Sequence, residues 1–328
     1  MKKRVALLYG GKSEEHDVSV MGYEYVLRLI EDCGYQAIPV YIDKEGRWFC
    51  DGSCVFPSPI EGGILTSESG QKIKVDATIP LLHGEGGESG EIQGLLKSAS
   101  IPFVGADVTT SSVCLDKHYT KCIAKNLGIP VVEWVVFPQN TKTDEALSMC
   151  ESVLDFPVFL KPRRLGSSIG AYAVKNAAEF CEYFPKSSAI GKGLVMAEKL
   201  VEDKRELECA YYSANERTLV SPPGEILNTG FYGYEEKYVN FANTSTEADV
   251  NDRIKSQINE YSLALADACG LRHLGRIDYF LAGNKLFFNE INTFPGFTAH
   301  SLYPKMIQKL GISPGEALRS FIEDAIGC

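Results

Sequence analysis

Two carboxylates, an amide and a guanidinium occur at alternating positions in the segment GRIDYFLAGNKLFFNEIN. The segment predicts two strands joined by a tight turn, and side chains two apart in a strand lie on the same face. With a three-residue turn, Asp278 lies opposite Glu290, and Arg276 lies opposite Asn292 on that face. A two-residue turn without a bulge would separate the two carboxylates. The pairing therefore predicts a three-residue turn or a bulge at 282–285.

The facing carboxylates of this hairpin would repel each other unless a cation lay between them. Asp278 and Glu290, together with the amide oxygen of Asn292, form a donor set made only of oxygen. Such a set suits Mg²⁺ that is shared with substrate phosphates. The alternative is a partly exposed edge hairpin in which Arg276 forms a salt bridge. The apolar residues around the polar positions favour the metal site.

A run of basic and then small residues, KPRRLGSSIG (161–170), directly follows the apolar run FPVFL. Backbone N–H groups in such a loop can bind phosphate oxygens, and Lys161 can reach a phosphate as a point charge. The alternative is a hairpin turn with solvated basic neighbours. The chain carries a net charge of -10, so a local basic cluster favours an anion-binding loop.

A third polar segment, GGKSEEHDVS, follows the first predicted strand. It resembles the end of a P-loop, but Ala6 occupies the position of the first glycine in that motif. No G-x-G-x-x-G sequence follows a predicted strand either. Acidic side chains at the end of a strand suit an amine ligand, and a solvated acidic turn is the alternative that stays open here.

The elements that would position these groups alternate between strand and helix over the first hundred residues. RVALLYGG, QAIPVYID and DATIPLLHG predict strands, and EIQGLLKSAS predicts a helix. This alternation is typical of an open parallel α/β sheet. Ligands of such sheets bind at the carboxyl ends of the strands, where Gly10–Gly11 and His83–Gly84 fall.

The remainder of the chain predicts a different, mixed organisation. Residues 110–128 predict one helix that a glycine ends. Short β-rich runs from 131 to about 210 surround one helix near 176–184, which is typical of a small antiparallel α+β lobe. Residues 228–248 are aperiodic, and so long a loop is usually functional or disordered. The sequence from Ser313 to Glu316 predicts a capping box at the start of the last helix.

The composition excludes several classes of protein. The net charge of -10 argues against general nucleic-acid binding and against a basic membrane-binding surface. No window approaches 18 apolar residues, and the N-terminal apolar run is too short for a signal-peptide core. The ten cysteines include no C-x-x-C pair, so we expect reduced thiols in a cytoplasmic protein.

Five motifs occur in a fixed order along the chain: HGEGGESGEIQG, KPRRLGSSIG, EEKY, GRID and NEINTFPGFTAHS. Together they closely resemble the D-alanine–D-alanine ligases of the ATP-grasp superfamily, over nearly the whole chain. The resemblance implies an N-terminal substrate-binding domain at 1–112, a central ATP-grasp lobe at 113–208 and a C-terminal lobe at 209–328. It also implies a flexible loop at about 228–248.

The activity that this resemblance implies has two steps. ATP phosphorylates the carboxylate of one D-alanine, and the amine of a second D-alanine then attacks the acyl phosphate. The product, D-alanyl-D-alanine, is a peptidoglycan precursor. The resemblance further implies two Mg²⁺ (or Mn²⁺) ions and a homodimer.

Individual roles also follow from the resemblance. By this resemblance, Glu15 accepts the ammonium of the first substrate, and Ser167 and Tyr238 tie the phosphate loop and the flexible loop to Glu15. Arg276 and the Gly296 amide form the implied oxyanion site, and Ser301 and Leu302 bind the carboxylate of the second substrate. The implied nucleotide contacts are Lys117, Lys161, Ser168, Glu198, Glu206, Phe231, Lys237 and Asn289. The implied metal ligands are Asp278, Glu290 and Asn292.

Departures from the family pattern leave the acceptor as the main alternative. Ser89 and Gly233 stand where aspartate is usual, and the spacing before Glu206 is one residue longer than in some members. Relatives that use D-lactate lack the loop tyrosine found here as Tyr238. Relatives that use D-serine often have arginine at the position of Leu302. D-alanine is therefore the expected acceptor. A non-catalytic nucleotide-binding protein would be expected to lose the metal ligands or Arg276, which are all present.

Overall fold

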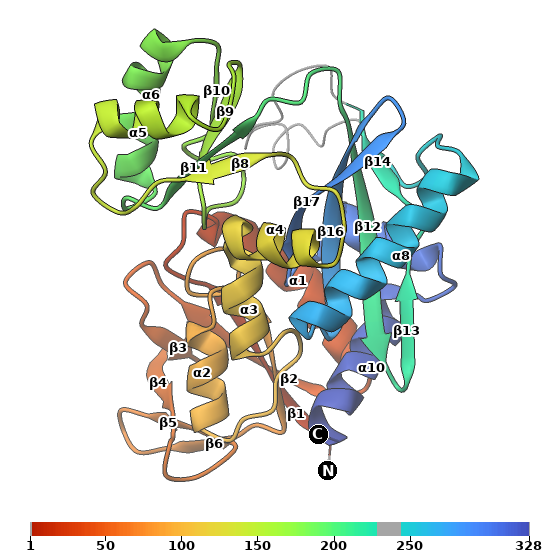
Figure 1. Cartoon of the computed structure of the whole chain (residues 1–328). Coiled ribbons are helices and arrows are strands. Elements are labelled where there is room, and N and C mark those ends of the chain that lie inside the picture. The colour runs from red at the N-terminus through yellow and green to blue at the C-terminus, as the bar shows by residue number, and fades with distance from the viewer. Residues whose placement is uncertain (1, 228–243, 328) are drawn as a thin grey trace.

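The computed structural model describes residues 2–227 and 244–327, and within them the chain forms three β-sheets with helices packed around them (Figure 1). The first sheet has the order β6-β5-β4-β3-β2-β1-β7. Its strands are β1 (Arg4–Gly10), β2 (Gln36–Ile42), β3 (Trp48–Cys50), β4 (Ser53–Pro57), β5 (Ile64–Ser67), β6 (Lys72–Lys74) and β7 (Ala77–Leu81). Helices α1 (His16–Asp32) and α2 (Glu91–Ser98) belong to the same part of the chain.

The first sheet is mixed, whereas the sequence predicted a parallel one. Strand β1 pairs in parallel with β2 and β7, as expected, but the strands from β2 to β6 pair antiparallel to each other. The connections between these outer strands are short, and a parallel connection needs a crossover of about a dozen residues or more. All five residues of β7 are buried, as is typical of a strand covered on both faces.

The second sheet is antiparallel, as predicted, and has the order β10-β9-β11-β8. Its strands are β8 (Trp134–Val136), β9 (Val158–Pro162), β10 (Tyr172–Val174) and β11 (Val195–Lys199). Two helices cover it rather than the single predicted one: α6 (Ala177–Ile190) and α5 (Thr143–Glu151). The missed helix α5 buries Ala146 and Cys150, which are four residues apart on one face.

The third sheet carries the hairpin on which the carboxylates lie. It contains β12 (Arg205–Ala214), β13 (Arg217–Val220), β14 (Gly224–Ile226), β15 (Thr244–Ser245), β16 (His273–Ala282) and β17 (Lys285–Asn292). Of the described helices in this part, α8 (Asp252–Cys269) lies between β15 and β16, and α9 (Leu302–Gln308) and α10 (Pro314–Gly327) follow β17. The capping box of α10 is confirmed, because Ser313 and Glu316 exchange hydrogen bonds between their backbone N–H groups and side chains.

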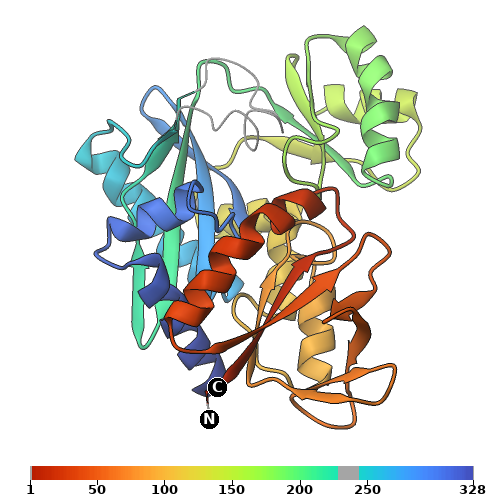
Figure 2. The ribbon, with the colours of Figure 1, turned by 180° about the vertical axis from the view of Figure 1, so that it is seen from behind.

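An apolar core joins the first and third sheets. Val5 and Ile30 from the N-terminal part share a cluster with Tyr212, Tyr303 and Phe321 from the C-terminal part. Figure 2 shows the corresponding arrangement, in which α1 lies against the C-terminal helices. No described helix is long and apolar enough to cross a membrane.

The predicted helix at 110–128 is two helices, α3 (Val108–Leu115) and α4 (Lys117–Asn126). The break lies at Asp116, whose backbone is extended and whose side chain accepts a hydrogen bond from the N–H of His118. Arg163 and Arg164 both pair with this fully buried carboxylate. An N-capping aspartate competes with helix continuation, and the break places Lys117 at the start of a new helix beside the hairpin.

Candidate active site

Two neighbouring cavities of about 320 and 300 Å³ lie around the β16–β17 hairpin. The first cavity lies between the N-terminal part, the hairpin and α9. The second lies between the sheet of β9 and the hairpin. Both cavities are lined by the same six residues: Lys117, Gly166, Ser167, Glu208, Ile226 and Glu290. A group held in one cavity can therefore meet a group held in the other at this junction.

The hairpin brings together the residues that its sequence predicted. Asp278 lies opposite Glu290 and Arg276 lies opposite Asn292 in the antiparallel register. These pairings are confirmed, but the predicted place of the irregularity is wrong. The turn has two residues, because Ala282 pairs with Lys285.

A bulge further along the hairpin restores the shared face. The register shifts between Asp278 and Tyr279, so that Asn289 is the extra residue on β17. Gly283 has a φ of 57°, which the first position of a tight hairpin turn requires. The side-chain Oδ1 of Asn289 is buried and has no hydrogen-bond partner among the described residues. Asn289 also lines the second cavity, so this oxygen is an acceptor available to a ligand.

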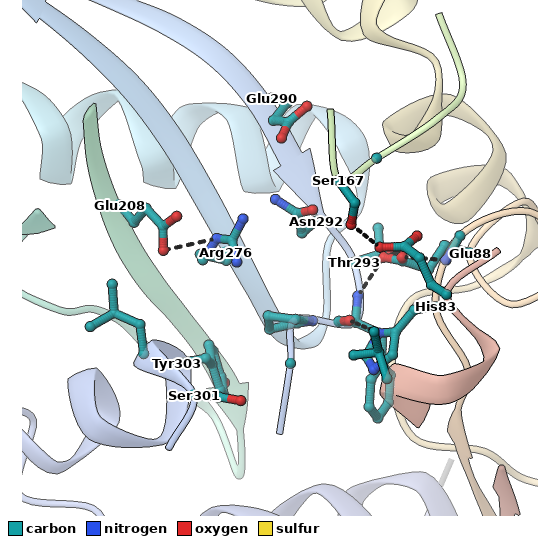
Figure 3. A pocket seen from close by; sticks show the side chains of 18 of the residues that line it. His83, Glu88, Ser167, Glu208, Arg276, Glu290, Asn292, Thr293, Ser301 and Tyr303 are labelled. Carbon is teal, nitrogen blue, oxygen red and sulfur yellow. Dashed lines mark hydrogen bonds and ion pairs between the residues drawn. The ribbon is translucent and has the colours of Figure 1, made fainter. Parts of the chain in front are cut away.

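Arg276 and Asp278 form a tight pair on one face of the hairpin, and Figure 3 shows Arg276 beside Asn292 on that face. Nε and Nη2 of Arg276 donate to Oδ1 and Oδ2 of Asp278 at 2.8 and 2.7 Å. The amide nitrogen of Asn292 donates to the same carboxylate at 3.1 Å. Burial alone would lower the pKa of Arg276, but the carboxylates of Asp278 and Glu208 outweigh it and raise that pKa well above its usual value.

Lys117 links the hairpin to the phosphate-binding candidate loop. Its Nζ lies 3.1 Å from Oε2 of Glu290 and donates to the carbonyl of Leu165 at 2.8 Å. Leu165 belongs to the KPRRLGSSIG segment. The ammonium of Lys117 therefore lies at the junction of the two cavities, where a transferred phosphate would need positive charge.

Glu15 and Ser167 meet across the first cavity, although they are 152 residues apart. Ser167 donates a hydrogen bond from Oγ to Oε1 of Glu15 at 2.6 Å. Both Ser167 and Ser168 have positive φ values, 52° and 58°, a conformation that costs non-glycine residues energy and recurs at binding sites. A side chain at Gly84 would collide with Oε2 of Glu15 at 2.6 Å, so this glycine makes room for the carboxylate.

A buried cluster of three charges borders the second cavity. Glu198 pairs through Oε1 with Lys161 at 2.5 Å and through Oε2 with Lys121 at 3.0 Å. Burial would raise the pKa of Glu198, but the two lysines lower it to about 2. Burial lowers the pKa of Lys161 to about 8, and Glu198 opposes this shift while Lys121 adds to it. Lys161 lines the second cavity, so it can contact a ligand there.

Two residues without a predicted role, His83 and Glu88, hold the turn after β17. Oε1 of Glu88 accepts hydrogen bonds from the N–H of Phe294 and the hydroxyl of Thr293, at 3.0 and 3.2 Å. The ring Nδ1 of His83 donates to the carbonyl of Phe294 at 3.1 Å. Loss of hydration raises the pKa of Glu88. HGEGGESG signals these residues in the sequence, but their partners lie more than 200 positions away.

The far end of the first cavity contains the remaining predicted residues. Gly296, Ser301 and Leu302 line it. The hydroxyl of Ser301 accepts a hydrogen bond from the N–H of Thr298 at 3.0 Å. In the second cavity Ser168 and Glu206 line the wall, and Glu206 pairs with Lys204 at 3.0 Å. Phe231, Lys237 and Tyr238 lie outside the described residues.

The N-terminal and C-terminal parts each match a family model. Residues 4–106 match "D-ala D-ala ligase N-terminus", and residues 123–323 match "D-ala D-ala ligase C-terminus". The chain belongs to the D-alanine–D-alanine ligase family. It is thus a ligase of the ATP-grasp superfamily, and its family implies the use of ATP and a place in peptidoglycan synthesis.

Relatives match over nearly the full length. The D-alanine–D-alanine ligase of Solibacter usitatus is 36% identical, with 99% of this chain and 96% of that relative covered. The D-alanyl-alanine synthetase A structure from Vibrio cholerae is 32% identical with a TM-score of 0.90, covering 100% of this chain and 99% of that one. The VanG D-Ala:D-Ser ligase from Enterococcus faecalis is 29% identical with a TM-score of 0.88, covering 99% of this chain and all of that one.

Proposed function

We propose that this ligase joins two D-alanine molecules to D-alanyl-D-alanine, with ATP converted to ADP and phosphate. The observation that carries the proposal is the junction of the two cavities at Lys117, Ser167 and Glu290. A nucleotide in the second cavity and an amino acid in the first would meet there. Phosphoryl transfer needs positioning and charge neutralisation more than covalent help from the protein, and this junction offers both.

In the first step the γ-phosphoryl group passes to the carboxylate oxygen of one D-alanine, and ADP leaves. The hydroxyl of Ser167 holds the carboxylate of Glu15 in place. Glu15 would accept hydrogen bonds from the ammonium of this D-alanine. Lys117 and Lys161 would neutralise the phosphates from the junction and from the second cavity. The amide oxygen of Asn289, which has no partner among residues 2–227 and 244–327, would accept a hydrogen bond from a donor on the nucleotide.

The hairpin donors fit a hard divalent cation. Asp278, Glu290 and Asn292 share one face and would supply two carboxylates and one amide oxygen, as Mg²⁺ prefers. The amide nitrogen of Asn292 already donates to Asp278, which leaves its oxygen for the ion. When bound, Mg²⁺ would neutralise charge on the phosphate oxygens.

In the second step the amine of the second D-alanine attacks the acyl carbon, phosphate leaves, and the amine loses its extra proton. Negative charge develops on the former carbonyl oxygen. Arg276 and the backbone N–H of Gly296 line the first cavity where this charge would form. Fixed donors aimed at a developing oxyanion are among the largest contributors to enzymatic rate.

The acceptor preference rests on apolar side chains of the first cavity. Leu302 lines its far end beside Ser301, Ile226 lines its junction with the second cavity, and both side chains suit a methyl group. A hydrophobic pocket disfavours an added hydroxyl group by about 10²-fold. D-serine, the acceptor in the name of the Enterococcus faecalis relative, would therefore compete poorly. A homodimer and a cytoplasmic location stay predictions.

Coupled ADP release with D-alanine, combined with mass detection of the dipeptide, tests the function. We expect D-alanyl-D-alanine and one ADP for each dipeptide formed. D-serine and D-lactate are then supplied with D-alanine as competing acceptors at neutral pH. Preferential formation of a mixed product would overturn the acceptor assignment, and ADP release that is independent of D-alanine would overturn the ligase proposal.

A further inference from the structure

Two carboxylates on two different strands contact the guanidinium of Arg276, and Figure 3 shows the contact with Glu208. Asp278 is on the same strand, β16, and accepts two hydrogen bonds. Glu208 is on the neighbouring strand β12, and its Oε2 lies 3.2 Å from Nε of Arg276. Glu208 lies directly opposite Asp278 in the register of the two strands. The two carboxylates and the guanidinium thus converge on one face of the sheet.

Glu208 faces the cavities rather than the apolar core. Its neighbours on the strand, Leu207 and Cys209, belong to the core cluster, and alternation places Glu208 on the other face. The residue is 6% exposed and lines both cavities. A carboxylate so buried is costly unless a positive charge compensates it. Arg276 provides that charge.

If Asp278 alone held Arg276, it would have to bind the metal ion and orient the guanidinium at the same time. This step rests on the proposed function, in which Asp278 is a metal ligand. When its oxygens bind a divalent cation, they cannot all accept hydrogen bonds from Arg276. The cation also repels the guanidinium. Glu208 is outside the donor set of Asp278, Glu290 and Asn292, so it keeps its negative charge for Arg276.

We propose that Glu208 is a positioning residue that keeps Arg276 directed into the first cavity while Asp278 binds the metal. A guanidinium has five N–H donors, so it can remain bonded to Glu208 and still donate to a developing oxyanion. The competing assignment makes Glu208 a further metal ligand. The two assignments differ in the Mg²⁺ concentration that the enzyme requires.

Steady-state kinetics of Glu208→Gln separate these assignments. As a positioning residue, Glu208 is expected to contribute about 10- to 100-fold to kcat, with the KM for ATP and the Mg²⁺ concentration for half-maximal activity unchanged. A marked rise in that Mg²⁺ concentration would identify a metal ligand and overturn the proposal. An unchanged kcat would also overturn it.

Glu225→Gln is the matched control. Glu225 is 8% exposed and lies on β14, which pairs with β12. It accepts two hydrogen bonds from Arg205, at 2.7 and 2.6 Å. It is not among the described residues that line either cavity. Thermal unfolding of both variants measures the cost of a broken buried ion pair, and only Glu208→Gln is expected to lose kcat.

A measurement independent of activity follows the side chain of Arg276 itself. In ¹H–¹⁵N NMR spectra, the Nε–H resonance of Arg276 is assigned by its loss in Arg276→Lys. We expect this proton to exchange slowly with solvent in the presence of Mg²⁺ and a non-hydrolysable ATP analogue, and to exchange faster in Glu208→Gln. Equal protection in both proteins would overturn the proposal. If the wild type makes no dipeptide, the proposed function fails, while this spectrum still tests the contact between Glu208 and Arg276.

Discussion

The two charge clusters that border the cavities differ in what their charges face. The lobe cluster, Lys121, Lys161 and Glu198, has side chains that are 0%, 8% and 3% exposed, and its charges pair with each other. The hairpin cluster comprises Arg276, Asp278, Asn292, Glu290 and Lys117. Its Arg276 and Glu290 side chains are 21% and 20% exposed.

The difference indicates two uses of buried charge. In the lobe cluster, Glu198 compensates the charges of Lys121 and Lys161 inside the protein. These ion pairs fix the position of Lys161 before any ligand binds. The hairpin cluster leaves part of its charge facing a cavity, where a ligand can exchange one partner for another. Substitutions in the hairpin cluster should therefore change activity more than stability, and those in the lobe cluster should show the opposite balance.

The largest expected effect is on the activity of hairpin variants. Asp278→Asn and Glu290→Gln remove the carboxylates proposed to hold the metal and should each lower kcat/KM by on the order of 10³-fold. Coupled ADP release measures the loss, and urea unfolding should show a much smaller change in stability. If both variants kept full activity, the metal assignment would be wrong.

The next effect is on the stability of a lobe variant. Glu198→Gln leaves Lys121 and Lys161 buried without a counter-charge, and removal of one partner from a buried ion pair costs about 3 kcal/mol or more. Urea unfolding at neutral pH measures this loss. The contrast between the clusters would fail if Glu198→Gln were as stable as the wild type.

A pH effect of intermediate size follows from the pKa of Lys161. Burial lowers this pKa to about 8, so Lys161 loses its charge as the pH rises through 8. The quantity kcat/KM for ATP reports groups of the free enzyme, and it should fall by up to about tenfold per pH unit above 8.

Lys161→Arg is the control for this titration, because arginine stays protonated over the whole range. Its profile should be flat between pH 7 and 9.5 even if its activity is lower. A flat profile in the wild type would show that Lys161 does not contact the nucleotide phosphates, or that it stays charged in spite of burial.

The smallest expected effect is that of Lys121→Met. Glu198 keeps Lys161 as a partner in this variant, so no buried charge is left without a counter-charge, and the loss of stability should be smaller than that of Glu198→Gln. Lys121 contributes to the low pKa of Lys161. The midpoint of the ATP profile should therefore move to higher pH, and an unchanged midpoint would contradict the coupling.

Local sequence patterns predicted those elements whose structure depends on residues close together in the sequence. The capping box at Ser313 needed only short-range spacing. The break at Asp116 was missed because Arg163 and Arg164, which stabilise it, lie almost 50 residues away. The mixed first sheet was missed because short apolar runs do not reveal the direction in which they pair.

In the β16–β17 hairpin, the sequence predicted the pairing of the side chains but not the position of the backbone irregularity. Its alternating polar residues correctly predicted that Asp278 pairs with Glu290. Polar side chains among apolar neighbours are costly to bury singly, and a shared face allows them to compensate one another. The predicted irregularity at 282–285 was wrong, and the bulge lies at Asn289. Turn length and bulge position are coupled, so either solution gives the same face, and only backbone packing chooses between them.

The sequence by itself determined which groups are present and, through its ordered motifs, the family to which the chain belongs. The tertiary structure decided which groups meet. Glu15 contacts Ser167, Glu88 holds Phe294, and Glu208 pairs with Arg276. Each contact joins residues at least 68 positions apart, and a short-range pattern holds no information about partners at that distance. The arrangement of the three sheets around the two cavities brings these charges together, and the cost of burying a charge without a partner makes the pairing specific.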